Sequence, residues 1–249
     1  MNVTFLIPIY QHKDEIGGVV ASLEPYGLPC TIIDDGSDAA TRAVLASLTQ
    51  RFPRVSVHRR DRNGGRGAAL KTGYRLAQQR GYTHALQLDA DGQHDAADVP
   101  SFLREMEAHP TALVLGAPRF DSSAPRSRLY GRQLSRAMVW MATRSYDVED
   151  PLCGFRGVPL APAVALLERK ATGDHMEFDP QFVIEMHRAG VPVRNVPTRV
   201  VYAEGGLSHF DMLRDNARMT RVYAKALLGA PWSRARGGDP SRDTADAGR

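Results

Sequence analysis

Two aspartates one residue apart, Asp89 and Asp91, lie in the stretch LQLDADGQHD at residues 86–95, directly after apolar and amide residues. The pattern predicts a buried strand that ends in a turn, which Gly92 permits, so that both carboxylates converge. Two such charges about 4 Å apart repel each other by about 4 kcal/mol at an effective dielectric constant of about 20. A cation would offset this repulsion. Oxygen ligands, with the neighbouring amide of Gln93, favour Mg²⁺ or Mn²⁺ over Zn²⁺.

A glycine-rich run, RNGGRG at residues 62–67, precedes a predicted helix and contains Arg66, and Lys71 follows one turn later. Glycine lets backbone amides approach an anion closely, and the start of a helix adds partial positive charge. The run therefore suits a diphosphate. It is neither a Walker loop nor a dinucleotide fingerprint, which would follow the first strand.

Each of these clusters also has a purely structural interpretation. The aspartates at 89 and 91 fit a solvated turn, with Asp95 or Asp98 capping the next helix. The run at 62–67 fits an ordinary glycine turn, and DDGSD at 34–38 fits an Asx turn with a helix cap.

Short apolar runs alternate with helical patterns through the first half of the chain. Strands are expected at 3–10, 30–37, 55–59, 84–92 and 112–119, and helices at 15–23, 39–51, 68–80 and 98–109. This alternation predicts an α/β protein, a mostly parallel, Rossmann-like sheet flanked by helices in a single domain. Ligands of such sheets bind beyond the carboxyl ends of the strands, so we expect the three polar clusters to converge at one edge.

The pattern is less regular after residue 119. An Arg-rich helical segment, a DPLCGFRG loop from residue 150 and MEFDPQFVIEMHRAG leading into another helix are expected there. We divide a domain at 1–230 into two halves, at 1–118 and 119–230, the second of which ends in a basic amphipathic helix. Residues 231–249 lack periodicity and are predicted to be a disordered tail.

The composition is that of a globular protein, with 249 residues of which 43% are hydrophobic and 24% charged. No apolar run approaches the roughly 20 residues needed to cross a bilayer, and the N-terminus lacks a signal-peptide pattern. A cytoplasmic protein is therefore expected. Cys30 and Cys153 lie far apart without histidines at ligand spacing, which argues against a disulfide scaffold and a zinc site.

Residues 119–144 contain six arginines and one acidic residue, which predicts an anionic partner. Two stripes of basic residues have helical spacing: Arg128, Arg132 and Arg136, and Arg214, Arg218, Arg221 and Lys225. Apolar neighbours of both stripes suggest peripheral docking on the inner face of an anionic membrane, and solvated helix faces are the alternative. Nucleic acid is not expected, because the polar clusters converge at a sheet edge instead of forming a basic and aromatic track.

The order of the motifs is more specific than any one of them. A strand ending at Pro8, then IIDDGSD, NGGRGAALKTG, LQLDADGQHD, DPLCGFRG and MEFDPQF, resembles the family 2 glycosyltransferases of the GT-A fold. The nearest resemblance is to the polyprenyl-phosphate branch, such as the dolichol-phosphate mannose synthases. It covers the chain from Val3 to about residue 210.

The resemblance implies roles on the donor side. It places Pro8, Tyr10, Asp34 and Asp35 at the nucleoside, Gly65, Arg66, Lys71, Asp89 and Ala90 at the rest of the nucleotide sugar, and Asp89, Asp91 and Gln93 at Mg²⁺ or Mn²⁺, with His209 as a further candidate. Arg66 stands where relatives usually carry Lys. The relatives' YNE after the first strand is YQH here, which leaves Gln11 and His12 without an assigned role.

The resemblance also implies inversion by direct displacement, in which a metal held by Asp89 and Asp91 stabilises the leaving nucleoside diphosphate. A hydroxyl acceptor would need a general base, for which Asp179 matches the family's region and Glu177 is the second candidate. A lipid phosphate is already ionised and would instead need cations. The residues implied for the acceptor are Arg119, Arg132, Ser135, Arg136, Gly154, Phe155 and Arg156.

The leading hypothesis is therefore transfer of a sugar from a UDP- or GDP-sugar to a membrane-associated lipid or lipid phosphate. The first alternative is a hydroxyl acceptor on a glycolipid, polysaccharide or pigment precursor. A sugar nucleotidyltransferase would carry its glycine run after the first strand, where PIYQHKDE stands. A non-catalytic sugar-nucleotide-binding module is the remaining alternative.

Overall fold

The computed structural model describes residues 1–119, 126–200 and 212–228, except for the side chains of 126–128 and 212. Within these residues one sheet has the strand order β3-β2-β1-β4-β6-β5-β7. The strands are β1 (Val3–Ile9), β2 (Cys30–Asp34), β3 (Val55–Arg59), β4 (His84–Gln87), β5 (Leu113–Arg119), β6 (Arg156–Pro159) and β7 (Val193–Arg199). Only β6 runs antiparallel to its neighbours, which confirms the expected mostly parallel sheet.

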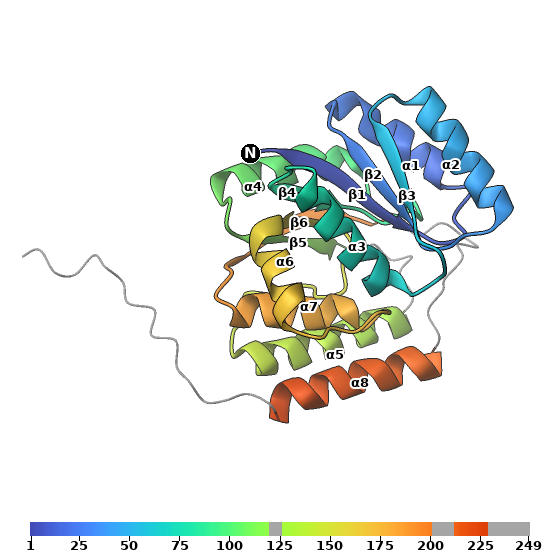
Figure 1. Ribbon diagram of the computed structural model, residues 1–249. Helices are drawn as coiled ribbons and strands as arrows, with labels where there is room; N and C mark the ends of the chain where they lie inside the picture. The colour runs from blue at the N-terminus through green and yellow to red at the C-terminus, as the bar shows by residue number, and fades with distance from the viewer. Residues whose placement is uncertain (120–125, 201–211, 229–249) are drawn as a thin grey trace, which may run out of the picture.

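Helices cover both faces of the sheet (Figure 1). One face carries α1 (Ile16–Leu23), α2 (Ala39–Arg51) and α4 (Val99–Ala108), with the short 3₁₀ helices η1 (Glu24–Tyr26) and η2 (Ala96–Asp98). The other face carries α3 (Arg66–Gln79), α6 (Leu160–Arg169) and α7 (Phe178–Arg188). Beyond α7 lie α5 (Arg126–Thr143) and α8 (Met212–Leu228), which contact each other and α7.

The central strand shows why the first half of the chain reads as apolar runs. Every residue of β1 is buried, with Leu6 in the core beneath α3 and Phe5 and Ile7 in the core beneath α1. A strand covered on both faces has no solvent side, so the sequence of β1 does not alternate and is apolar except for Thr4, whose hydroxyl donates to the carbonyl of Pro29. Several carboxylates of the site come at or after the ends of such strands.

The five expected strands and four expected helices are confirmed, with β2 ending at Asp34 and β4 ending at Gln87, both earlier than predicted. β6, α6 and β7 were not predicted, and the DPLCGFRG segment runs into β6 instead of remaining a loop. The residues of β7 include Pro197 and two arginines, which are typical of a strand at the sheet edge and hide its pattern.

Other predictions from the sequence have mixed outcomes. Cys30 and Cys153 are both buried free thiols, as expected. No helix in the described part of the chain is long and apolar enough to span a bilayer. His209 and the tail at 231–249 lie outside the described residues. The division into halves at residue 118 stays a prediction.

Candidate active site

A cavity of about 560 Å³ opens beyond the carboxyl ends of the parallel strands, where the polar clusters were expected to converge. Most of the predicted donor-side residues lie in its wall: Pro8, Tyr10, Asp35, Gly65, Arg66, Asp89, Ala90, Asp91 and Gln93. Asp34 and Lys71 do not. The three clusters therefore meet, but not every residue in them faces the same space.

The glycine run after β3 is joined to the aspartates after β2. Asp35 accepts hydrogen bonds from the backbone N–H groups of Gly64 (3.1 Å) and Gly65 (2.7 Å) and pairs with Arg60. Asp34 is buried, pairs with Arg59 and accepts from another backbone N–H group. The amides predicted to hold a diphosphate thus satisfy a carboxylate of the protein itself.

Arg66 lies at the start of α3 between two carboxylates from distant elements. One of its terminal nitrogens is 2.5 Å from Asp89 Oδ1, and its Nε donates to Asp179 Oδ2 at 2.7 Å. The other oxygen of Asp179 is 3.1 Å from a guanidinium nitrogen of the fully buried Arg156. Charges of alternating sign therefore run from Asp89 to Arg156, and each buried charge has a partner.

The two aspartates of the DAD triplet differ electrostatically. Burial alone would raise the pKa of Asp89, but the Arg66 guanidinium and His94 outweigh it and hold that pKa well below its usual range. The pKa of Asp91 is raised, first by burial and then by the charge of Asp89. Asp91 accepts one hydrogen bond, from the backbone N–H of Gln93 at 3.0 Å. Asp91 is thus a half-buried carboxylate in need of positive charge.

This donor set fits a hard divalent cation shared with a substrate. Mg²⁺ is usually bound by one or two carboxylates together with substrate phosphates, and Asp89 and Asp91 supply such a pair. Asp89 Oδ1 already lies against Arg66, so Asp91, which accepts a hydrogen bond from the Gln93 N–H and pairs with no cation among the described residues of the cavity wall, is the carboxylate that still needs positive charge. No group of three or more His, Cys, Asp or Glu side chains in the described ranges could hold a metal. Any metal here would therefore need the phosphates to complete its coordination.

The turn after β4 brings a further residue to Asp89. Gly92 has φ of 71°, a left-handed conformation that turns the chain back toward the site. His94 then lies with Nε2 3.5 Å from Asp89 Oδ2 and its ring centroid 5.5 Å from that of Phe155. His94 was not among the residues predicted from the sequence. Its position within LQLDADGQHD was the available signal.

The residues at 154–156, predicted to contact the acceptor, lie beneath the donor-side carboxylates. A Cβ atom at Gly154 would be 2.0 Å from Asp89 Oδ2, so only glycine lets the carboxylate pack there. Phe155 is fully buried and stacks on Phe102 with 3.9 Å between centroids. Arg156 is fully buried and donates to the carbonyls of residues 151 and 153. A residue that contacts the acceptor needs exposed atoms. Phe155 and Arg156 have none, so the predicted acceptor role is replaced by a structural one: they pack and hydrogen-bond inside the protein.

The other predicted acceptor residues lie on β5 and α5, away from the cavity wall. Arg119 is exposed at the end of β5, and Arg132 pairs with Asp150 at 2.5 Å. Ser135 is 3% exposed. The Arg136 guanidinium lies 4.8 Å from the centroid of a tryptophan ring on its own helix. The structure does not bring these four residues together with the donor residues.

Basic residues of α8 lie in the cavity wall instead. Arg214, Asp215 and Arg218 line it, with Arg218 3.2 Å from Asp215 Oδ1. The sequence revealed their helical spacing, but spacing alone cannot tell which side of a helix faces a ligand. His175 and Met176, which precede α7, complete this side of the wall and were not predicted.

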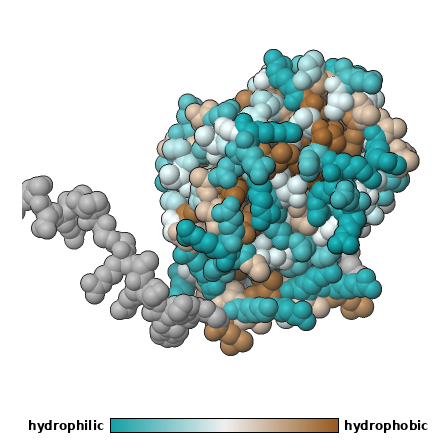
Figure 2. All heavy atoms as spheres, viewed as in Figure 1, coloured by the Kyte–Doolittle hydropathy of each residue, from teal (hydrophilic) through white to brown (hydrophobic). Residues whose placement is uncertain are grey.

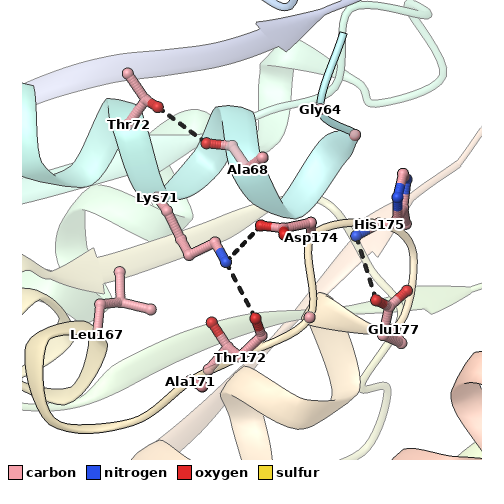
Figure 3. Close-up of polar contacts among 12 residues, drawn as sticks. Gly64, Ala68, Lys71, Thr72, Leu167, Ala171, Thr172, Asp174, His175 and Glu177 are labelled. Carbon is pink, nitrogen blue, oxygen red and sulfur yellow. Dashed lines mark hydrogen bonds and ion pairs between the residues drawn. The ribbon is translucent and has the colours of Figure 1, made fainter.

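Neither Lys71 nor Glu177 lines the cavity: Lys71 contacts the segment at 170–177, and Glu177 belongs to that segment. Figure 3 shows Lys71 reaching Asp174, 2.7 Å away, and donating to the carbonyl of Thr172 at 3.1 Å. Glu177 is 7% exposed and is absent from the wall of this cavity. The phosphate contact of Lys71 and the second base position of Glu177 therefore have no support in this arrangement.

Comparisons with known proteins agree with this architecture. The family model described as glycosyl transferase family 2 matches residues 4–173. The undecaprenyl-phosphate mannosyltransferase of Micrococcus luteus is 27% identical over 84% of this chain and 87% of its own. The UDP-N-acetylglucosamine–dolichyl-phosphate N-acetylglucosaminyltransferase of Methanococcus voltae is 23% identical over 81% of this chain and 86% of its own.

A solved structure gives the same fold. The mannosyltransferase of Pyrobaculum calidifontis, in complex with GDP-Man and Mn²⁺, aligns with a TM-score of 0.64 and 18% identity over 92% of this chain and 65% of that one. Its likeness identifies the single α/β domain as a GT-A fold. The family model, which matches more than half of the chain, and the residues that converge at the sheet edge lead to one conclusion: the chain belongs to glycosyl transferase family 2 and is a glycosyltransferase.

Proposed function

We propose that the protein moves a sugar from a UDP- or GDP-sugar to a polyprenyl phosphate or a related lipid phosphate, with inversion at the anomeric carbon and with Mg²⁺ or Mn²⁺ bound. Relatives named for dolichyl-phosphate and undecaprenyl-phosphate acceptors support the acceptor class. The proposed place of work is the cytoplasmic face of a membrane, where such acceptors expose their phosphate.

The observation that carries the proposal is the pairing of the carboxylates in the cavity wall. Among its described residues, Asp35, Asp89, Asp179 and Asp215 each lie in an ion pair with an arginine. Asp91 lies in none of these pairs, and we assign it to the metal. Within the described part of this wall no carboxylate is then left to take a proton from a hydroxyl acceptor, whereas a phosphate acceptor needs none removed.

Asp179, predicted as a base, is therefore proposed as an anchor for Arg66. A base must exchange a proton, and protonating Asp179 would remove its attraction to Arg66 and Arg156. Arg66 held in this way keeps positive charge beside Asp89. A divalent metal bound at Asp89 and Asp91 would supply Lewis-acid stabilisation to the leaving diphosphate. Arg214 and Arg218, at the same wall, are proposed to bind phosphate oxygens.

The experiment that tests the proposal is a donor screen with undecaprenyl phosphate in detergent, with Mn²⁺, and with the lipid product read by mass spectrometry. We expect one nucleotide sugar to yield a lipid-linked sugar, and the corresponding alcohol, undecaprenol, to yield none. Asp91→Asn should lower turnover by about 100-fold or more.

Asp95→Asn is the matched control. Asp95 lies in the same loop but caps η2 by accepting from the N–H of Ala97, and asparagine caps equally well. Its turnover should match the wild type. Unchanged turnover in Asp91→Asn, or transfer to undecaprenol as fast as to its phosphate, contradicts the proposal.

A further inference from the structure

A second cavity, of about 470 Å³, lies between α7 and α8 and is also lined by the segment at 170–173. One wall includes Gln181 and Glu185 on α7 with Glu177 directly before it, and α8 contributes Arg218, Arg221 and Lys225. Nothing in the donor-side chemistry uses this space. We call it the α7–α8 cavity.

Two polar atoms at this cavity are buried without a hydrogen-bond partner among the described residues, Glu177 Oε2 and Thr172 Oγ1. Glu177 is 93% buried, since 7% of it is exposed. Its other oxygen receives only a long hydrogen bond, 3.4 Å, from the backbone N–H of His175 (Figure 3). A buried carboxylate oxygen left without a donor is destabilising, which points to a donor that enters from the cavity.

The wall opposite Glu177 is strongly basic. The residues that line the cavity include five cations and two carboxylates. Glu185 is already engaged by Lys170 and Arg188. Arg221 and Lys225, one turn apart on α8, are both exposed and project from the same helix face as Arg218. Such an arrangement attracts an anionic group, while Glu177 and Thr172 require hydroxyl or other donors.

Arg218 connects this cavity with the active site, because it lines both. We infer that the α7–α8 cavity is a second ligand site, for an anion that also carries hydroxyl groups, such as a phosphorylated sugar. Its phosphate lies against Arg221 and Lys225, and its hydroxyls donate to Glu177 and Thr172. The existence of this site is independent of the proposed reaction, but its place on the acceptor side rests on that proposed function.

Calorimetric titration of the whole chain with glucose 6-phosphate, without nucleotide or metal, tests the site. We expect glucose 6-phosphate to bind more tightly than inorganic phosphate, and glucose to bind undetectably. Arg221→Ala with Lys225→Ala should weaken glucose 6-phosphate binding by about tenfold or more, since charged hydrogen bonds are lost. Glu177→Gln should leave phosphate binding intact and remove the preference for the sugar.

Arg42→Ala with Arg51→Ala removes the same charge from exposed positions on α2 and should bind like the wild type. Two results overturn the inference. One is an absence of glucose 6-phosphate binding, or binding that the Arg221 and Lys225 changes do not alter. The other is binding that saturating UDP or GDP with Mn²⁺ abolishes, because the sugar phosphate would then occupy the donor cavity.

A lipid head group could present the same chemistry, and phosphatidylinositol vesicles form the second arm of the experiment. Weaker vesicle binding in the Arg221 and Lys225 variant assigns a phosphorylated head group, whereas weaker binding of glucose 6-phosphate alone assigns a free sugar phosphate. Turnover of a nucleotide sugar without glucose 6-phosphate binding would refute only this inference. Binding without any sugar transfer would refute only the proposed function.

Discussion

At the scale of single residues, Arg66 determines what its neighbours can do. It bridges Asp89 and Asp179, and Asp179 also lies against the buried Arg156. Removing one member of such a buried set leaves a charge without a partner, which costs more than the pair itself contributes. The identity of residue 179 should therefore matter to stability as well as to turnover.

Asp179→Asn distinguishes an anchor from a general base. If Asp179 is an anchor, the substitution should lower the free energy of unfolding by about 3 kcal/mol, because Arg66 and Arg156 lose a buried counter-charge. Urea denaturation measures this change. The shape of the pH profile of kcat/KM should stay unchanged, since no titrating base is removed.

The control for this variant is Asp147→Asn. The Asp147 side chain is 63% exposed, and the charged group nearest to it in an ion pair is a histidine nitrogen at 3.5 Å. It should change stability by less than about 1 kcal/mol. If Asp179→Asn instead abolished the acidic limb of the pH profile while the protein kept its stability, Asp179 would be the base and the acceptor a hydroxyl.

At the scale of elements, the segment before α7 is fastened to the first turns of α3. The backbone N–H of Ala68 donates to the carbonyl of Asp174 at 3.0 Å, and Lys71 binds both Asp174 and the carbonyl of Thr172 (Figure 3). His175, in the same segment, lines the donor cavity. The position of this wall therefore depends on contacts made outside the cavity.

Lys71→Met and Asp174→Asn should give non-additive effects. Each should lower stability by about 1 kcal/mol or less and weaken nucleotide binding, with Lys71→Met the larger because it also loses the hydrogen bond to the Thr172 carbonyl. The double variant should be no worse than Lys71→Met, because the contact between residues 71 and 174 is already lost in it. Calorimetry with UDP or GDP and Mn²⁺ measures the binding arm.

Lys13→Met, which removes an exposed lysine paired with Asp14, is the control and should bind nucleotide normally. Should Lys71 contact the diphosphate directly, its substitution would weaken nucleotide binding strongly while Asp174→Asn had no effect. That outcome would restore the role first predicted for Lys71 from the sequence.

Local patterns were sufficient to predict the first half of the fold. The strands up to β5 are apolar runs followed by turn residues, so they place Asp35, Arg66 and Asp91 at one edge without knowledge of long-range contacts. What failed depends on contacts distant in sequence. Phe155 becomes internal because β6 inserts antiparallel between β4 and β5. Arg218 lines the cavity because α8 packs back on α7, which no local spacing reveals.

At the scale of the whole molecule, α5 and α8 form an outer layer away from the sheet (Figure 1). Large apolar side chains on these two helices are exposed: Tyr130, Leu134 and Met141 on α5, and Leu213, Leu227 and Leu228 on α8. Figure 2 shows apolar side chains among hydrophilic ones at the lower edge of the molecule, where Figure 1 has α8. An exposed apolar set of this kind is typical of a protein or membrane contact.

Some cations of the two basic stripes predicted from the sequence have other contacts at this scale, and their membrane role stays a prediction. Arg218, Arg221 and Lys225 line the α7–α8 cavity, and Arg132 pairs with Asp150, so these cations are not simply a membrane-facing row. We expect membrane docking through this layer to draw mainly on the exposed apolar side chains. Such binding should depend only weakly on salt, because screening acts on charges and not on apolar burial.

Leu134→Ser with Leu213→Ser tests this docking at positions 65% and 85% exposed. Each leucine buried in the interface contributes about 1.5 kcal/mol or more, so the double variant should partition onto phosphatidylglycerol vesicles about 100-fold more weakly. Flotation measures the partition. Hydrolysis of the nucleotide sugar in the absence of vesicles shows whether the active site is intact. Tyr146→Ser, at a position 80% exposed just after α5, is the control with the same kind of change. Equal flotation of all three proteins, or flotation abolished by salt, would show that this apolar layer does not meet the membrane.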